Sequence, residues 1–227
     1  MFFESIMQEY SRAKEERISE EIHDSDPRKS NVISTLIDKK IKSGNHVWVM
    51  TDWHLLKWNK ETKTVYKSRD LSEIIRNCQE MIREDDLLIF LGDLCDGNVE
   101  IKRDIESFIE RIPGEKILVR GNNDLFDDDW YLKHGFKYVT PKFIWDDILF
   151  SHRPQDNDNR INIHGHFHGT CTYYNNEISK YTNQIDVAWL GGRTKPIPLQ
   201  TCINSLPKYA KSVTFINHPW KPRSHKE

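Results

Sequence analysis

Three short apolar runs in the first half of the chain each stop at a small group of polar residues. The runs span 47–50, 87–91 and 116–120, and the segments at about 69–83 and 99–112 carry apolar residues at helical spacing. Strands that alternate with helices form a largely parallel sheet, and ligands bind beyond the carboxyl ends of its strands. The pattern therefore predicts an α/β domain with functional side chains along one edge of a sheet.

The second half of the chain has a different rhythm, with short β-rich pieces in close succession. They lie at 136–139, 142–145, 147–151, 160–164, 170–174 and 185–189, and a short helix at 201–209 and a strand at 213–216 are expected to follow. Pieces spaced so closely indicate hairpins. The two halves together favour a mixed α/β sandwich.

Two helices are expected before the first strand, at 2–22 and at 31–42, with Ser30 or Asn31 capping the second. The second helix is expected to pack on the core. The first is either a second core helix or an extension that forms a lid or a dimer contact. The predicted organisation is a helical extension at 1–45, one domain at 46–216 and a loose, mildly basic tail at 217–227.

Composition limits the function classes. The chain has 227 residues and a net charge of −2, so no general basic field indicates binding to long nucleic acids. It contains no apolar run of membrane-spanning length and no secretory signal layout. The four cysteines, scattered without a C-x-x-C pair, are typical of reduced thiols. A cytoplasmic protein of one domain is predicted, with no membrane partner.

The polar residues that follow the strands form a mixed oxygen and nitrogen ligand set. In chain order they are Asp52, His54, Asp93, Asn122, His152, His166 and His168. Such a mixture suits Mn²⁺, Fe, Ni²⁺ or Zn²⁺ better than Ca²⁺ or Mg²⁺, and it differs from the Cys-rich set of a structural zinc site. Seven ligands suit two ions if one carboxylate bridges them, and a pair about 3.5–4 Å apart can hold a hydroxide aimed at phosphorus.

Each of these residues alone has an ordinary explanation. A lone Asp after a strand is usually a cap or turn residue, and Asn122 beside a glycine is a typical turn amide. In an extended segment, His166 and His168 would point to the same side and could converge on one point. Alternating histidines on a solvent-facing strand would look the same. Only the joint order of the seven residues favours a metal site.

With its polar groups taken together, the sequence resembles the calcineurin-like metallophosphoesterase family. The five family blocks stand here as Asp52-Trp53-His54, Gly92-Asp93, Gly121-Asn122-Asn123-Asp124, Ser151-His152 and Gly165-His166-Phe167-His168. The resemblance covers about residues 46–190 and is greatest to small bacterial and phage members. It implies two facing mixed β-sheets flanked by helices, a four-layer sandwich.

The resemblance also implies the roles of the ligands. One ion would be held by Asp52, His54, Asp93 and His168, and the other by Asp93, Asn122, His152 and His166, so that Asp93 is the bridge. The family places a histidine after the metal-binding Asn, near the leaving group. This chain has Asn123 there, and an amide cannot deliver a proton at neutral pH.

Other residues near the blocks receive narrower expectations. Arg120 and Arg153 could clamp phosphate oxygens, whereas a surface salt bridge is expected for Arg160. Asp124 is expected to orient its loop, and His164 to fill its strand or to replace the missing acid. Five aromatic residues could stack on bases, although Trp189 is expected to lie in the core (Trp53, Phe167, Tyr173, Tyr174 and Trp189).

The function predicted from these features is a phosphoesterase with two divalent ions, Mn²⁺ before Fe, Ni²⁺ or Zn²⁺. With Asn123 in place of the acid, phosphodiesters or nucleotides are favoured over monoesters. Short single-stranded nucleic acid is a further substrate class, and the N-terminal helices would allow a homo-oligomer. The alternatives are a phosphomonoesterase or protein phosphatase, and a metal-binding scaffold with little turnover.

Overall fold

A computed structural model describes residues 26–55, 57–59, 64–66, 71–95, 102–155, 160–168 and 183–205. Several expectations concern segments outside these ranges and stay predictions. They are the helix at 2–22, the strands at 170–174 and 213–216, the tail at 217–227, and the roles of Tyr173 and Tyr174.

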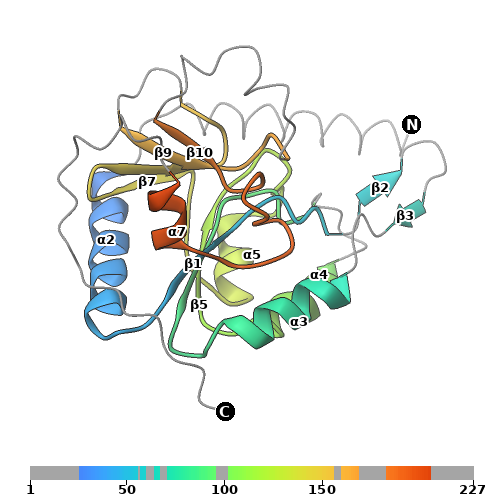
Figure 1. The fold of residues 1–227 in the computed structure, drawn as a ribbon. Coiled ribbons are helices and arrows are strands. Elements are labelled where there is room, and N and C mark those ends of the chain that lie inside the picture. Colours follow the sequence, from blue (N-terminus) through green and yellow to red (C-terminus); the bar gives the residue numbers. More distant parts are fainter. Residues whose placement is uncertain are drawn as a thin grey trace.

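The first sheet is built from the strands that the alternating pattern predicts. Its order is β11 (Ile197–Pro198), β1 (Val47–Met50), β4 (Leu87–Phe90), β5 (Glu115–Val119) and β6 (Phe136–Thr140). Strands β1, β4, β5 and β6 are parallel, and β11 pairs antiparallel with β1 at the edge (Figure 1). An edge position suits β11 because its proline cannot donate to a further strand.

The second sheet comes from the second half of the chain. Its order is β10 (Gln184–Asp186), β9 (Ile161–His164), β8 (Ile148–Ser151) and β7 (Lys142–Trp145). The hairpins expected in this half are confirmed only for β7 and β8, which pair antiparallel, whereas β8, β9 and β10 are parallel and the expectation is wrong for them. Both sheets are therefore mixed, and the predicted fold class is confirmed.

Alternation along the strands of the first sheet divides the core in two. Val47 and Val49 of β1 belong to the cluster shared with the second sheet, whereas Trp48 and Met50 belong to the cluster under the helices. This is the two-residue period of a strand that is buried on both faces. The sheet is therefore held between a layer of helices and the second sheet.

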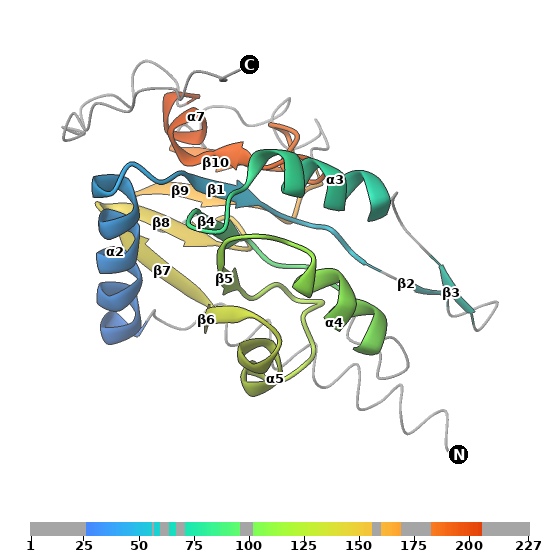
Figure 2. The same ribbon diagram turned by 90° about the horizontal axis from the view of Figure 1, so that it is seen from below.

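The helices cover the two clusters from opposite sides. Helices α3 (Leu71–Met81), α4 (Lys102–Glu110) and α5 (Asp128–Lys133) pack on the outer face of the first sheet. Helices α2 (Pro27–Lys42) and α7 (Leu199–Asn204) contribute to the cluster between the sheets. Figures 1 and 2 show α2 on the side of the molecule away from α3 and α4. In the described part of the chain, no helix combines the length and apolarity that a membrane span requires.

Before α3, one helix start and one loop differ from the expectation. Helix α2 begins at Pro27, not at 31, because the Asp26 side chain caps it by accepting from the Arg28 amide and proline suits the first helical position. The region 55–67, expected as a polar loop, contains the hairpin of β2 (Lys57–Asn59) and β3 (Thr64–Tyr66). The β-forming residues of β3 were the available signal for it.

The two tryptophans near the motifs lie in opposite environments. Trp53 is only 2% exposed and packs on Phe90, with 4.4 Å between ring centroids. Trp189 is 60% exposed, so the expectation that it belongs to the core is wrong. The reason is that β10 ends at Asp186, three residues before Trp189, which therefore lies in a turn.

Candidate metal centre

The side chains of the five motifs meet at one edge of the molecule, beyond the carboxyl ends of the parallel strands. Asp52 and His54 follow β1, Asp93 follows β4, and Asn122 follows β5. His152 follows β8 of the second sheet, and the histidine loop at 165–168 follows β9. Both sheets thus contribute ligands to the same place.

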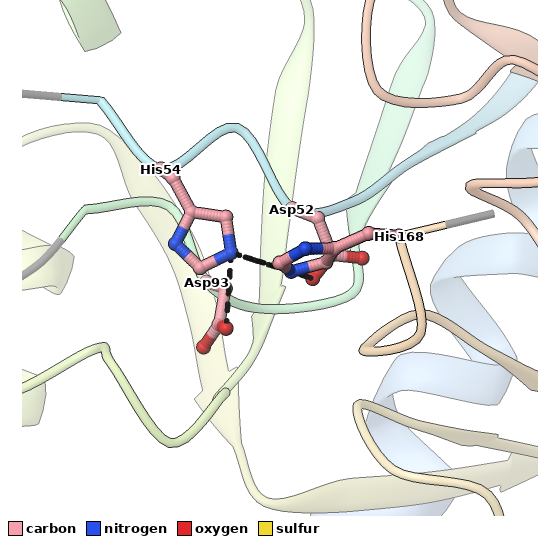
Figure 3. A group of neighbouring side chains, drawn as sticks. All are labelled: Asp52, His54, Asp93 and His168. Atoms are coloured by element: carbon pink, nitrogen blue, oxygen red, sulfur yellow. Dashed lines mark hydrogen bonds and ion pairs between the residues drawn. The ribbon is translucent and has the colours of Figure 1, made fainter. Parts of the chain in front are cut away.

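A first cluster could hold a metal ion and consists of Asp52, His54, Asp93 and His168. Figure 3 shows the four side chains pointing toward one another. The Nε2 atoms of His54 and His168 are 2.8 Å apart. His54 Nε2 lies 3.3 Å from Asp93 Oδ2, and His168 Nε2 lies 3.3 Å from Asp52 Oδ1. The cluster offers two carboxylates and two imidazoles within coordinating range of a single point.

The Asp52 carboxylate is held by one oxygen only. Its Oδ2 accepts from the His166 amide at 2.9 Å and lies 2.8 Å from the Thr51 hydroxyl. Its Oδ1 is buried, has no hydrogen-bond partner among the described residues, and faces the imidazoles of the cluster. A buried anionic oxygen without a donor is costly, and a cation at this point would satisfy it. The residues therefore fit a metal ion.

A second cluster shares Asp93 with the first and adds His152 and His166. His152 Nε2 lies 3.4 Å from Asp93 Oδ1, and His166 Nδ1 lies 3.2 Å from His152 Nε2. The two oxygens of Asp93 thus face different clusters, Oδ2 toward His54 and Oδ1 toward His152. This is the geometry that a bridging carboxylate needs.

The tautomer of His152 is set by a backbone contact. Its Nδ1 lies 2.7 Å from the Leu91 carbonyl, which can only accept, so Nδ1 carries the proton. The lone pair is then on Nε2, the atom that faces Asp93. A hydrogen bond of this kind behind an imidazole is typical of metal-ligating histidines.

The backbone conformation of the site is unusual. Seven non-glycine residues of the described chain have positive φ, and five of them belong to the two clusters: Asp52, His54, Asp93, His166 and His168. The expectation that His166 and His168 lie on an extended segment is therefore wrong. β9 ends at His164, and the left-handed turns after it send the two imidazoles to different clusters.

Glycines at the site allow segments to approach closely. A Cβ at Gly165 would lie 1.9 Å from Thr51 Oγ1 and 2.6 Å from Asp52 Oδ2. A Cβ at Gly121 would lie 2.3 Å from Asp93 Oδ1. All three distances are far inside van der Waals contact, so a side chain at either position would displace a carboxylate of the first cluster.

Asp124 and Asn123 support the carboxylate that the clusters share. Asp124 is fully buried and accepts from the amides of Asp93, Leu94 and Gly121, each at 2.8 Å. It thereby fastens the end of β5 to the end of β4. Asn123 donates to both oxygens of Asp93, from its amide at 2.9 Å and from Nδ2 at 2.7 Å.

The arginines near the motifs occupy different surroundings. Arg120 is 3% exposed, forms an ion pair with Asp128 and donates to two loop carbonyls, which favours a structural role over a phosphate clamp. Arg153 is half-buried and reaches Asn122 Oδ1 at 2.9 Å and His166 Nε2 at 3.1 Å, which places its guanidinium at the second cluster. Arg160 pairs with Asp147 at the surface.

His164 lies beside the clusters without joining them. Its Nδ1 donates to the Gly165 carbonyl at 2.8 Å, which leaves Nε2 without a proton and, within the described chain, without a hydrogen-bond partner. Burial lowers the pKa of His164 to about 4. A neutral imidazole whose only proton is bound to a carbonyl suits the strand-filling role better than the acid role.

The charges of the clusters also favour cations. Burial raises the pKa of Asp52, but His168 and His54 outweigh it, so the pKa lies well below the usual value. Burial likewise opposes the effect of His152 on Asp93, and the net pKa is again lowered. Burial, together with the electrostatic effect of the neighbouring His152 and Arg153, lowers the pKa of His166 to about 4. At neutral pH the site thus holds two carboxylates and a neutral His166.

Two contributors to the site were not found from the sequence. Thr51 fixes the Asp52 carboxylate and lies directly before it. Arg193 reaches the carbonyl of Asp52 at 3.2 Å and that of His168 at 3.5 Å. Arg193 lies 141 residues after Asp52 in the chain, and no local pattern marks such a contact.

A family model described as calcineurin-like phosphoesterase matches residues 46–224 of the chain. The chain belongs to the calcineurin-like phosphoesterase family. The uncharacterized protein MJ1445 of Methanocaldococcus jannaschii is 26% identical over 183 residues, which cover 75% of this chain and 96% of that protein. The similarity thus extends over nearly the whole length of MJ1445.

Two solved structures are similar to this phosphoesterase. A protein of unknown function, AQ665 from Aquifex aeolicus, has a TM-score of 0.51 at 22% identity, over 70% of this chain and 98% of that one. The nuclease MPE of Pseudomonas putida has a TM-score of 0.40 at 19% identity, over 54% of this chain and 61% of that one. The likeness to AQ665 concerns the fold.

Family membership and the ligand cluster together establish the general activity. The chain is a metal-dependent phosphoesterase, and Asp52, His54, Asp93 and His168 form a cluster that could hold a divalent metal ion.

Proposed function

We propose that this phosphoesterase binds two divalent ions, with Mn²⁺ preferred, and hydrolyses phosphodiesters or nucleotide esters in preference to monoesters. The observation that carries the two-ion part is Asp93, whose two oxygens face the two clusters separately. Asn122 would complete the second ligand set, and its Oδ1 lies close to His166, since both contact the Arg153 guanidinium. Two bound ions would supply an activated water and offset the charge that develops on the phosphoryl group.

The residues of the chain orient the substrate and the ligands. Arg153 is half-buried beside the second cluster, and its planar guanidinium is suited to grip two phosphate oxygens. Asn123 holds the bridging carboxylate in place through two hydrogen bonds. The water-derived nucleophile and the leaving group would then lie on opposite sides of the phosphorus, as in-line displacement requires.

The preference for diesters rests on the absence of a proton donor at position 123. An amide cannot protonate a poor leaving group, and the loss of general-acid catalysis costs about 10²–10⁴-fold. His164 offers no replacement, because its one proton is bound to the Gly165 carbonyl. Esters whose leaving group is stable as an anion depend least on such a donor.

The test compares p-nitrophenyl phosphate with bis-p-nitrophenyl phosphate in the presence of Mn²⁺. We expect the wild type to cleave the diester faster, and Asp93→Asn to abolish cleavage because the shared ligand is lost. Asp146→Asn, which changes an exposed turn carboxylate of the same left-handed conformation, is the matched control and should retain activity.

The role of residue 123 is tested separately with Asn123→His. The new imidazole should raise monoester hydrolysis by up to about 10²–10⁴-fold and affect the diester less. A wild type that already prefers the monoester, or an Asn123→His variant with no gain, would contradict the proposed preference. Metal binding without turnover of either ester would instead support a scaffold role.

A further inference from the structure

The loop at 187–195 carries the most exposed large hydrophobic side chain of the described residues, Trp189 at 60%. The other three exposed large hydrophobics lie on helices, Val32 on α2, Met81 on α3 and Leu132 on α5. Tryptophan is highly buried on average, so an indole presented to solvent indicates a contact surface. A single flat ring on a loop is better suited to a planar ligand than to a broad protein interface.

The turn that presents Trp189 is well defined. The Gly191 amide donates to the Ala188 carbonyl at 3.2 Å, which places Trp189 and Leu190 at the two corners of a four-residue turn. Leu190 is partly buried against the cluster between the sheets, whereas Trp189 projects outward. The Gly192 amide closes the base of the turn by donating to the Val187 carbonyl at 2.9 Å. The indole is therefore held on a constrained support.

The same loop is bonded to the segments that carry the metal ligands. The Thr51 amide donates to the Gly192 carbonyl at 3.0 Å, and Arg193 donates to the carbonyls of Asp52 and His168. At its other end, the Val187 amide donates to the His164 carbonyl at 2.9 Å. Trp189 and Gly192 are three positions apart in the sequence, which limits their Cα separation to about 11 Å. The loop that carries Trp189 is thus bonded at both ends to segments that carry the residues of the two clusters.

We propose that Trp189 is a substrate-binding residue whose indole stacks on the planar base of a nucleotide ester while the phosphate lies at the metal centre. The inference rests on the proposed function and extends it by assigning the substrate a nucleobase. A stacking contact between a base and an aromatic side chain changes binding about 5- to 150-fold and tolerates different bases. The net charge of −2 favours single nucleotides over long nucleic acids as the source of that base.

The kinetic test uses two diesters that share a leaving group, thymidine 5′-(p-nitrophenyl phosphate) and methyl p-nitrophenyl phosphate, with Mn²⁺ present. Trp189→Ala should raise KM for the thymidine ester about 5- to 150-fold and leave the methyl ester within twofold. Trp189→Phe should restore most of the affinity because it keeps a ring. Leu132→Ala, which removes an exposed side chain on α5, should behave as wild type. Equal effects of Trp189→Ala on both esters, or none, would overturn the inference.

A binding measurement separates this inference from the proposed function. Tryptophan fluorescence is followed while thymidine 5′-monophosphate, and in parallel inorganic phosphate, is added in the presence of Mn²⁺. If the nucleotide quenches the wild type but not Trp189→Phe, stacking on Trp189 is supported. This holds even if the wild type hydrolyses neither ester, and then only the proposed activity fails. Quenching that is equal in wild type and Trp189→Phe, or absent from both, overturns the role of Trp189.

Discussion

At the scale of single residues, the site is held in backbone conformations that L-amino acids otherwise avoid. His168 has φ of 56°, and its carbonyl lies 3.5 Å from Arg193 Nη1. A left-handed non-glycine residue costs about 1–2 kcal/mol, so this geometry persists only because the surrounding contacts impose it. The backbone conformations that orient the candidate ligands therefore lower the stability of the folded protein.

This strain leads to a prediction about His168. Glycine adopts positive φ without a steric penalty, so His168→Gly should be more stable than His168→Ala by about 1 kcal/mol, although both lose the imidazole. Urea unfolding with chelator present measures the difference. The control is Lys39, exposed in α2, where glycine should be less stable than alanine by about 1 kcal/mol. If His168→Ala were more stable than His168→Gly, the backbone at position 168 would not be strained.

The buried His164 gives a second prediction, on pH. Its pKa of about 4 lies below the usual 6.5, so between these values the unfolded chain binds more protons than the native one. Native stability is therefore fully present above pH 6.5 and falls by about 3 kcal/mol as the pH drops from 6.5 to 4. His164→Asn should flatten this part of the profile, measured by urea unfolding with chelator present. An unchanged profile would mean that other groups govern acid sensitivity.

At the scale of elements, the strands and motif positions were largely predictable, whereas caps, the hairpin and loop conformations were less so. The apolar runs at β1, β4 and β5 are buried on both faces, and alternate residues of each run belong to different core clusters. Continuous apolar runs of this length are typical of such buried strands. The meeting of the candidate ligands was also predictable, because residues that follow parallel strands lie at the same edge of the sheet. The conformation of the histidine loop and the contacts of Arg193 depend on segments distant in the chain, so local patterns could not reveal them.

Helix α2 shows how an element outside the motif region supports the domain. Ser34 Oγ donates to the Ile144 carbonyl at 2.8 Å, and Trp145 Nε1 donates to Asp38 at 3.0 Å. Ile37 is completely buried in the cluster between the sheets. The helix expected to pack on the core therefore does so, along the edge strand β7.

Removal of this packing should destabilise the whole protein. Ile37→Ala should lower the free energy of unfolding by about 2–5 kcal/mol, because it leaves a cavity in the shared core. Val32→Ala, on the same helix at 48% exposure, should change it by less than about 0.5 kcal/mol. Equilibrium urea denaturation compares the two. Equal small effects would mean that α2 is dispensable to the core.

At the scale of the whole molecule, the two sheets meet at the metal centre. Asp52, His54 and Asp93 follow strands of the first sheet, and His152, His166 and His168 follow strands of the second. In the proposed arrangement, each ion has ligands from both sheets. A bound ion would then oppose separation of the sheets as well as serve the chemistry, because it binds the folded state alone.

Metal binding should therefore be measurable as thermal stability. At 100 times its dissociation constant a ligand adds about 2.7 kcal/mol, which for a protein of this size raises Tm by about 5–10 °C. We expect Mn²⁺ to raise the Tm of wild type by this amount relative to chelator. Asp93→Asn should lose most of the increment because both ions lose a ligand, whereas Asp146→Asn should keep it. If Asp93→Asn gained as much as wild type, Asp93 would not be the residue through which ions join the two sheets.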